Sequence, residues 1–584
     1  MYQGRIILVG ATPQLTDSDY YLRLWSLVSI VTEASILANK ITFSSNINIG
    51  QNGAENDDEF LFKCFVDHHA LSELTDIRNP SNFVLGSTGS GKTALLRMIE
   101  KNEENCESFE VHEMAMNHIA NSDVIQFLQS IDVDLSIFFQ ALWRHVICIE
   151  YIKLVTQADT KDKFRYIRTK IVDFVKRESV REKLVKFIDE NENRFWNTVD
   201  ENIIEITEGL ESTLTASLGG EVDKFVARAG YARGLSAEKK VQLQQRAKKF
   251  VDGNTIAELG HVISALSEYT KGRGDKYFIL IDRLDEAWVD ESIKYQLIQS
   301  LFEALKGLQK LRNLKVVVAL RSDVYERMIR EAPPSRTQLE KYNDYIIRLR
   351  WSKEQLRKLA EKRINHLFKW KYSSDNVHFD DIFKQRIDGR LSVWNYLVVR
   401  TLLRPRDVIN FINEVLQKSE GKSSISKSDF LKGEHTYSDL RFESLRYEWH
   451  GTYTGIGVLL ESLRNRPSYF SVAEFATSNF IDQLWDQIGK DAEGQKDDIW
   501  RLINKSIESD ELVEPINCCQ SMFSRLHLIG AVGLKLSSSA AWQWFHETGK
   551  PIPNHQIDMT TKARIHPMLH FALGISDRTV GKAT

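Results

Sequence analysis

Cysteine, proline and uninterrupted apolar runs are all scarce in this sequence, and each scarcity excludes a class of protein. The 584 residues include only five cysteines and ten prolines. The cysteines lack the paired spacing of a zinc site, and the adjacent Cys518 and Cys519 are poorly placed for a disulfide. The most apolar N-terminal run, residues 22–38, is interrupted by polar residues and has no signal-peptide features. We therefore expect a packed helix there, in a cytoplasmic protein without a membrane segment.

An excess of either charge is also missing. The chain has 77 Lys and Arg residues against 80 Asp and Glu residues, which gives a net charge of −3. This balance excludes a dedicated nucleic-acid coating protein, so any contact with DNA must be regional. The length predicts two to four domains. Because proline is scarce and no repeat is visible, the domain boundaries must come from motifs.

The stretch "FVLGSTGSGKTALL", residues 83–96, is the motif whose chemistry is most specific. An apolar strand leads into a glycine-rich loop, and a helix follows. Glycines let successive backbone N–H groups turn toward phosphate oxygens, while Lys92 reaches the outer phosphates and the Thr93 hydroxyl can bind Mg²⁺. The pattern GxxxxGKT predicts a nucleotide site. Its expected binding residues are Gly86, Ser87, Thr88, Gly89, Ser90, Gly91, Lys92, Thr93 and Ala94.

About 190 residues later, "KYFILIDRLDEAW" supplies an acid for the metal. The apolar residues 278–281 predict a buried strand, and Asp282 follows at its carboxyl end, where it could hold a metal-bound water. Glu286 is the favoured base for the attacking water, with Asp285 close behind it. The alternative is a buried strand that ends in a solvated acidic turn.

Two further strands are predicted next. "LKVVVALRSD", residues 314–323, is rich in β-branched residues and predicts the neighbouring strand of the core. Arg321 or Ser322 at its tip could face the γ-phosphate, although an ordinary cap of the strand end is an equal alternative. Residues 344–351 predict another strand.

The periodicity then becomes helical. Ser352 resembles an N-cap, and the following residues place apolar side chains on one face. Within residues 401–416, Arg404 and Arg406 flank Pro405, which suits a helix start. The two arginines could reach the nucleotide phosphates and couple a lid to ATP or ADP. The alternative is a solvated helix terminus.

The order of these motifs resembles the STAND and initiator-like branch of AAA+ P-loop ATPases, including bacterial ATPases related to KAP and NACHT proteins. The resemblance covers about residues 50–420. It implies an α/β fold in which a P-loop NTPase parallel sheet carries a long helical insertion. After an N-terminal segment (1–50), it implies a core at 51–350 with the insertion at about 155–260, a helical lid at 351–430 and a winged-helix-like module at 431–584.

The resemblance also implies residue roles. Arg321 would occupy the first sensor position, and Arg404 or Arg406 the second. Initiator ATPases usually place a glutamate directly after the metal-binding aspartate, where this chain has Arg283. This departure favours slow hydrolysis. The candidates for a finger that reaches a neighbouring subunit are Arg327, Arg330 and Arg336.

The insertion and the C-terminal module do not decide whether DNA is a partner. Residues 161–187 and 237–250 are basic and helical in pattern, but nearby acids favour a solvated amphipathic face over a DNA contact. The winged-helix-like module is expected to include a last strand with Ile565, His566 and Pro567. Winged helices bind DNA in initiators but are packing or autoinhibitory units in STAND proteins.

Two classes of function follow. The first is an ATP-hydrolysing switch that needs ATP and Mg²⁺ and changes conformation or oligomeric state between ATP and ADP, with a second copy or a separate effector as partner. Family analogy alone suggests a role in defence against phage. The second is an initiator-like or loader ATPase that binds DNA through the C-terminal module and the basic insertion.

Overall fold

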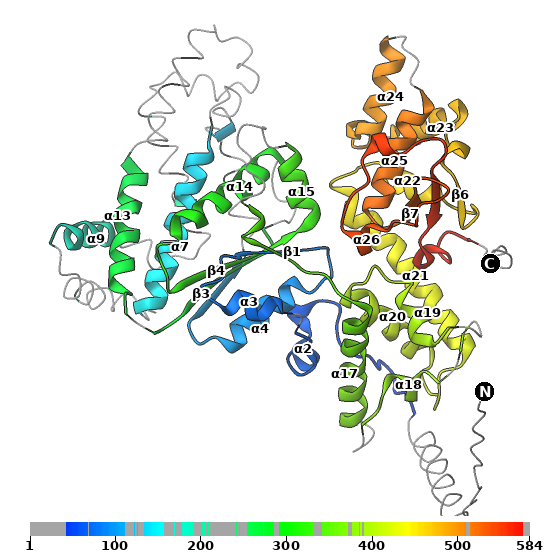
Figure 1. The fold of residues 1–584 in the computed structure, drawn as a ribbon, viewed down its shortest axis with the longest axis horizontal. Helices are drawn as coiled ribbons and strands as arrows, with labels where there is room; N and C mark the ends of the chain where they lie inside the picture. Colours follow the sequence, from blue (N-terminus) through cyan, green and yellow to red (C-terminus); the bar gives the residue numbers. More distant parts are fainter. Residues whose placement is uncertain are drawn as a thin grey trace, which may run out of the picture. The chain divides into compact units, whose positions relative to one another are not determined.

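The computed structural model describes most of the chain (Figure 1). The described residues are 42–67, 69–110, 134–156, 178–191, 254–272, 274–284, 291–331, 342–371, 376–384, 386–387, 391–509 and 514–575, with isolated residues between 119 and 245. The predicted helix at 22–38 and both basic runs of the insertion fall wholly or mostly outside them. The chain forms two compact units. We call them the α/β unit (52–356 and 403–407) and the helical unit (the remainder).

The α/β unit contains a five-stranded sheet whose strands are all parallel. Its order is β2-β3-β4-β1-β5. The strands are β1 (Phe83–Gly86), β2 (Cys106–Glu110), β3 (Tyr277–Asp282), β4 (Leu314–Arg321) and β5 (Ile346–Arg348). The predicted α/β class and four of these strands are confirmed, whereas β2 was not predicted. The apolar runs of β1, β3 and β4 are buried on both faces, as expected for strands covered by helices.

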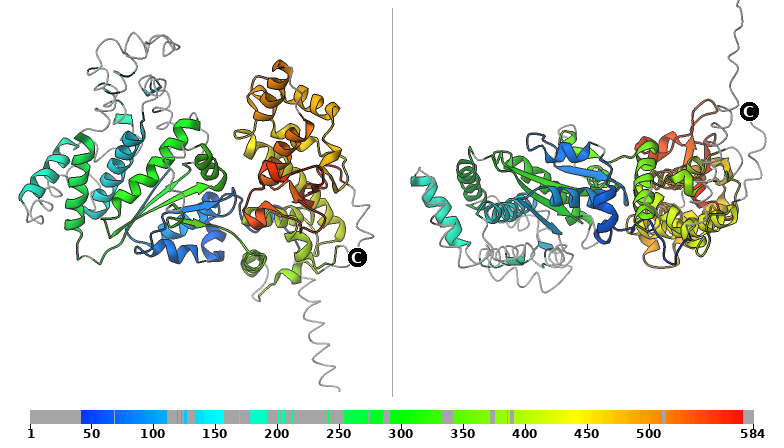
Figure 2. Two further views of the ribbon diagram at one scale, coloured as in Figure 1. Left: turned by 45° about the horizontal axis from the view of Figure 1, so that its top comes forward. Right: turned by 90° about the horizontal axis from the view of Figure 1, so that it is seen from below.

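Helices cover both faces of this sheet (Figures 1 and 2). The helices α3 (Ala70–Thr75) and α4 (Lys92–Asn102) pack on the face formed by Val84, Leu280 and Val317. The opposite face packs against α7 (Ser136–Thr156), α13 (Asn254–Tyr269) and α14 (Glu291–Leu308). Further elements of the unit are η1 (Ala54–Asn56), α2 (Asp58–Cys64), α9 (Glu178–Glu190) and α15 (Ser322–Glu331). Side chains therefore alternate between two separate cores along each strand.

The helical unit begins with a group of helices in the region where helices were predicted. They are α17 (Lys353–Lys371), α18 (Phe379–Ile382), α19 (Val393–Val398), α20 (Pro405–Lys418) and α21 (Lys427–His450). The Ser352 hydroxyl accepts a hydrogen bond from the Gln355 N–H at 3.2 Å, which confirms the predicted N-cap. Pro405 is the first residue of α20, as predicted. The first three residues of α20 belong to the α/β unit rather than to the helical unit.

The C-terminal part of the helical unit adds a small antiparallel sheet of order β6-β8-β7. Its strands are β6 (Tyr469–Ser471), β7 (Val532–Lys535) and β8 (Lys562–Ile565). The helices are α22 (Ile456–Glu461), α23 (Ser478–Ile488), α24 (Asp498–Ser509), α25 (Pro515–Leu528) and α26 (Phe545–Thr548). The expected strand through His566 and Pro567 is wrong, because β8 ends at Ile565 and His566 caps the short helix η8 (Pro567–Leu569).

The described helices were also compared with the requirements of a bilayer. None of them combines the length and the apolar character that a membrane span needs.

Candidate functional site

The loop between β1 and α4 has the backbone that its glycines predict. Gly89 and Gly91 have φ angles of +77° and +96°, in the left-handed region that favours glycine. The Ser90 N–H donates to the Ser87 carbonyl at 3.1 Å, which closes a turn inside the loop. Gly91 is the N-cap of α4. The loop therefore ends at a helix N-terminus, whose first N–H groups have no partner within the helix.

Packing also explains why two positions of the loop require glycine. A Cβ atom on Gly86 would lie 2.3 Å from the Ser90 hydroxyl oxygen. A Cβ atom on Gly89 would lie 2.8 Å from the Cβ of Arg406. Both distances are too short for real side chains. The loop is therefore held closely by its own residues and by residues 403–407, which are distant in sequence.

The polar side chains of the loop lie close to its backbone. The Lys92 ammonium donates to the carbonyls of Gly86 and Ser87 at 3.1 and 3.3 Å. The hydroxyls of Thr88 and Ser90 are buried and have no hydrogen-bond partner among the described residues. Burying a hydroxyl without a partner costs free energy. The loop therefore carries unused polar groups beside a cation.

Strand alternation brings Asp282 and Arg321 to the same side of the sheet as the start of α4. In β3, Phe278 and Leu280 face the α3 and α4 core, so Asp282 at the next even position leaves on that face. In β4, Val317 and Ala319 face it, and Arg321 follows with the same period. Gly86 and Arg321 are register partners in the sheet. The predicted loop, acid and arginine thus share one edge and one face.

The two charged residues at the strand ends have defined contacts. Asp282 is 8% exposed, and its carboxylate accepts a hydrogen bond from the Arg283 N–H at 2.9 Å. Arg283 has a φ of +57° and lies 3.7 Å from the Glu55 carboxylate. Arg321 forms a two-point contact with Asp323, with distances of 3.0 and 2.7 Å. The sequence analysis did not identify Asp323, although it lies only two residues from Arg321.

Of the two predicted lid arginines, Arg406 contacts the loop. Its backbone N–H donates to the Gly89 carbonyl at 3.4 Å, and its Nε donates to the Asn52 carbonyl at 3.1 Å. Arg404 is buried, with 6% exposure. The Trp351 indole N–H donates to the Ser90 carbonyl at 2.7 Å. Sequence reasoning missed Asn52 and Trp351, since no motif marks either residue.

The remaining predicted residues have separate positions. Asp285, Glu286 and Arg336 lie outside the described residues. Arg327 and Arg330 belong to α15, where the Arg327 guanidinium lies 5.8 Å from the centre of the Tyr295 ring. Within the described part of the chain, no group of three His, Cys, Asp or Glu residues could hold a metal ion. All five cysteines lie among the described residues, and none of them forms a disulfide.

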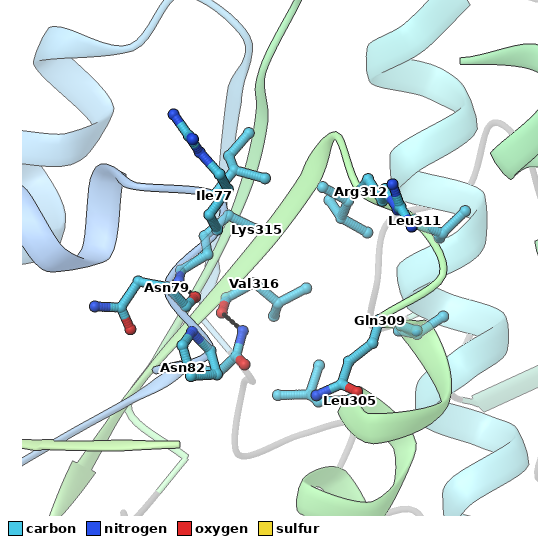
Figure 3. A pocket seen from close by; sticks show the side chains of 13 residues that line it. Ile77, Asn79, Asn82, Leu305, Gln309, Leu311, Arg312, Lys315 and Val316 are labelled. Carbon is cyan, nitrogen blue, oxygen red and sulfur yellow. Dashed lines mark hydrogen bonds between the residues drawn. The ribbon is translucent and has the colours of Figure 1, made fainter. Parts of the chain in front are cut away.

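A cavity of about 390 Å³ lies at the opposite, amino edge of the same sheet (Figure 3). Leu305 and Gln309 line one side of it, and Asn79 and Asn82 line the other. The Asn82 amide donates to the Val316 carbonyl at 2.6 Å. The buried Lys315 ammonium donates to the carbonyls of Asp76 and Asn79, at 3.3 and 2.5 Å. These side chains hold the turn before β1 and are separate from the predicted nucleotide site.

Comparisons with known proteins match parts of the chain. A model of the FunZ-associated C-terminal helical domain matches residues 354–446. The chain is 24% identical to the putative transposon gamma-delta 80.3 kDa protein of Escherichia coli (strain K12) over 325 residues, or 55% of this chain and 43% of that protein. It is 26% identical to Allergen Alt a 2 of Alternaria alternata over 147 residues, or 25% of this chain and 75% of the allergen. The chain thus spans less than half of the E. coli relative.

Proposed function

We propose that this chain is an ATP-binding and ATP-hydrolysing switch of the P-loop type, whose conformation or oligomeric state changes with the nucleotide. The observation that carries the proposal is the loop at residues 86–93. It combines two glycines with positive φ, a helix N-terminus, the Lys92 ammonium and buried hydroxyls that have no hydrogen-bond partner among the described residues, all at one edge of a parallel sheet. Anionic phosphate groups would satisfy such an arrangement.

Different residues of the chain would bind the phosphate groups and the Mg²⁺ ion. Backbone N–H groups of the loop would hold the phosphate oxygens, and Lys92 would exchange its two carbonyl contacts for charge-assisted hydrogen bonds to them. The Thr93 hydroxyl and the buried Asp282 carboxylate offer hard oxygen ligands of the kind that Mg²⁺ prefers. Mg²⁺, when bound, would neutralise phosphate charge. Glu286, or Asp285, is the proposed base that takes a proton from the attacking water.

Arg406 could transmit the nucleotide state of this site to α20. Its backbone N–H donates to Gly89 in the loop, its side chain donates to the Asn52 carbonyl outside the loop, and it belongs to the first turn of α20. An arginine that contacts ATP more strongly than ADP would shift the position of that helix by the difference in binding free energy. The proposal therefore describes a switch, with residues 403–407 as its sensing segment.

A direct test compares the size of the assembly in different nucleotide states. Size-exclusion chromatography with ADP, ATP and a non-hydrolysable ATP analogue should give different profiles for ATP and ADP. The same three samples with duplex DNA separate the two classes of function. Identical profiles in all nucleotide states, together with unchanged protease sensitivity near residue 430, would contradict the switch.

The second candidate is a DNA-binding loader ATPase. The name of the E. coli relative associates that protein with a transposon. The α-helices and strands follow one another in the order α22, β6, α23, α24, α25, β7, α26, β8, and β8 pairs with both β6 and β7, an arrangement that supports a winged-helix-like module. DNA binding with a steep salt dependence would favour this candidate.

One observation weakens that candidate. The helix α25 would be the natural reader of DNA in such a module, but its outward polar side chains are bound to residues 552–557. Gln520 donates to the Ile557 carbonyl at 2.8 Å, and Ser524 donates to the Ile552 carbonyl at 2.9 Å. The only cation of α25 besides His527 is Arg525, which is buried and paired with Asp497 at 2.8 Å. This helix offers no exposed cation to phosphates.

A more suitable basic surface lies on the other helices of the helical unit. Lys418, Lys427, Lys432 and His435 line an open groove of about 740 Å³ beside the first half of α21, where His435 lies 3.1 Å from the Asp439 carboxylate. If the chain binds DNA, replacement of the three lysines by glutamine should reduce both the affinity and its salt dependence. Unchanged DNA binding after this replacement would place the DNA contact elsewhere.

A further inference from the structure

Residues outside the loop at 86–93 donate hydrogen bonds to the backbone carbonyls of that loop. The Arg406 N–H donates to the Gly89 carbonyl at 3.4 Å. The Trp351 indole N–H donates to the Ser90 carbonyl at 2.7 Å. The second distance is typical of a good hydrogen bond from an N–H donor, whereas the first is long. The Ser90 carbonyl is therefore held more firmly than the Gly89 carbonyl.

A contact to the Ser90 carbonyl also sets the direction of the next N–H group. The peptide bond between Ser90 and Gly91 is trans, so its C=O and N–H groups point in opposite directions. Trp351 lies on the carbonyl side of this peptide group, and the Gly91 N–H is directed to the other side. Glycine has the widest choice of backbone angles of any residue, so this direction depends on contacts from outside.

Trp351 is itself held by the segments on both sides of it. The Leu349 N–H donates to the Leu85 carbonyl at 2.7 Å, which extends the pairing of β5 with β1 toward the loop. Directly after Trp351, the Ser352 hydroxyl caps α17. The indole ring lies beside the loop, 3.8 Å from the place that a Cβ atom on Gly91 would occupy. The donor therefore belongs to a short segment that is anchored at both ends.

We infer that Trp351 is a positioning residue of the phosphate site, an inference that rests on the proposed function. By binding the Ser90 carbonyl, Trp351 directs the Gly91 N–H toward the phosphate groups. Lys92 would exchange its carbonyl contacts for phosphate oxygens when a nucleotide binds, but the indole contact lies on the other side of the peptide group and would remain. The N–H group is thus oriented before the nucleotide arrives, which reduces the entropy lost on binding.

The first test measures the affinities of the full chain for ADP and for a non-hydrolysable ATP analogue by titration calorimetry. Trp351→Phe keeps an aromatic ring but removes the donor, and it should weaken both affinities by the same factor, about tenfold. The factors should be equal because both nucleotides present the same inner phosphates to the loop. Incorporation of 3-benzothienylalanine at position 351 replaces the indole N–H by sulfur with little change of shape, and it should cause the same loss.

Trp143 provides a matched control in the same unit. Its indole N–H donates to the Leu297 carbonyl at 3.1 Å, and the side chain is fully buried between α7 and α14. Trp143→Phe removes the same kind of hydrogen bond, so it should reduce the free energy of unfolding in urea at least as much as Trp351→Phe does. It should nevertheless leave both nucleotide affinities unchanged.

The second test observes the peptide group directly, because Ser90 and Gly91 form the only Ser-Gly pair in the sequence. Cell-free synthesis with carbonyl-¹³C serine and ¹⁵N glycine therefore gives one amide signal in a carbonyl-selected NMR spectrum. Addition of ADP should move its proton resonance downfield, since the N–H gains a phosphate acceptor. Trp351→Phe should move the carbonyl resonance upfield, because a hydrogen bond to that carbonyl is lost, and Trp143→Phe should move neither.

Several outcomes would overturn the role of Trp351. They are wild-type affinities in Trp351→Phe, equal losses in Trp143→Phe, or a Gly91 signal that ADP does not move. The proposed function fails separately, since Lys92→Ala would then leave ATP binding intact. If Lys92→Ala abolishes binding while Trp351→Phe is silent, the ATP site survives and only the role of Trp351 is rejected.

Discussion

The two edges of the five-stranded sheet are built in opposite ways. At the amino edge, the Lys315 ammonium and the Asn82 amide donate hydrogen bonds to backbone carbonyls beside the cavity. At the carboxyl edge, the buried hydroxyls of Thr88 and Ser90 have no partner among the described residues, and the backbone adopts positive φ angles. The comparison teaches that a visible cavity does not by itself identify a functional site. Unsatisfied polar groups and a constrained backbone indicate a ligand more directly.

The largest expected effect comes from removing the loop cation. Lys92→Ala should weaken ATP binding by about 10²-fold, because a charge that faces the phosphates is lost. The matched variant at the amino edge is Lys315→Met, which should bind ATP with wild-type affinity. Titration calorimetry on both folded variants is the measurement. Equal affinities in the two variants would remove the functional distinction between the edges.

The second effect separates the binding of ATP from its hydrolysis. Glu286→Gln should bind ATP normally but hydrolyse it slowly, by roughly 10²-fold, because the base for the attacking water is lost. Steady-state phosphate release measures this rate. If only Asp285→Asn shows this behaviour, Asp285 is the base. If neither variant is slow, the acidic turn is a solvated strand end.

The third effect concerns the discrimination between nucleotides. The double variant Arg404→Ala with Arg406→Ala should bring the ATP and ADP affinities together, a change of about tenfold, and should erase ATP-dependent assembly. Arg312→Ala at the amino edge is the control and should keep the wild-type difference. A wild-type ATP response in the double variant would make these arginines ordinary helix-terminal charges.

The smallest effect belongs to the amino edge and depends on pH. Burial lowers the pKa of Lys315 to about 8 from 10.5, although Asp76 partly opposes the shift. Between these values the unfolded chain binds more protons than the folded one, so the stability contributed by this group rises with pH. From pH 8 to 9.5, the wild type should gain about 1 kcal/mol over Lys315→Met in urea unfolding. A constant difference between the two proteins would contradict the buried, carbonyl-bound lysine.

Most of the loop could be predicted from the sequence, but few of the residues that surround it could. The glycines and Lys92 form one local pattern, and the alternation of β3 is sufficient to place Asp282 on the α4 face. By contrast, the contact from Trp351 to Ser90 spans 261 residues, and the contact from Arg406 to Asn52 spans 354. Such contacts depend on how the chain returns to the sheet, and no local propensity encodes that path. The pair of Arg321 and Asp323 depends on α15 beginning directly after β4, which spacing alone does not predict.

The return of residues 403–407 to the α/β unit has a consequence for how such chains can be recombined. The α/β unit consists of two segments of the sequence, 52–356 and 403–407, and residues 357–402 between them belong to the helical unit. A hybrid joined at residue 356 would take its Arg406 from the donor of the helices, together with the backbone that covers Gly89. A hybrid joined at residue 408 would keep both from the donor of the sheet. The choice of crossover point therefore decides which donor supplies residues 403–407. In a hybrid joined at residue 356, this segment must fit a loop that comes from the other donor.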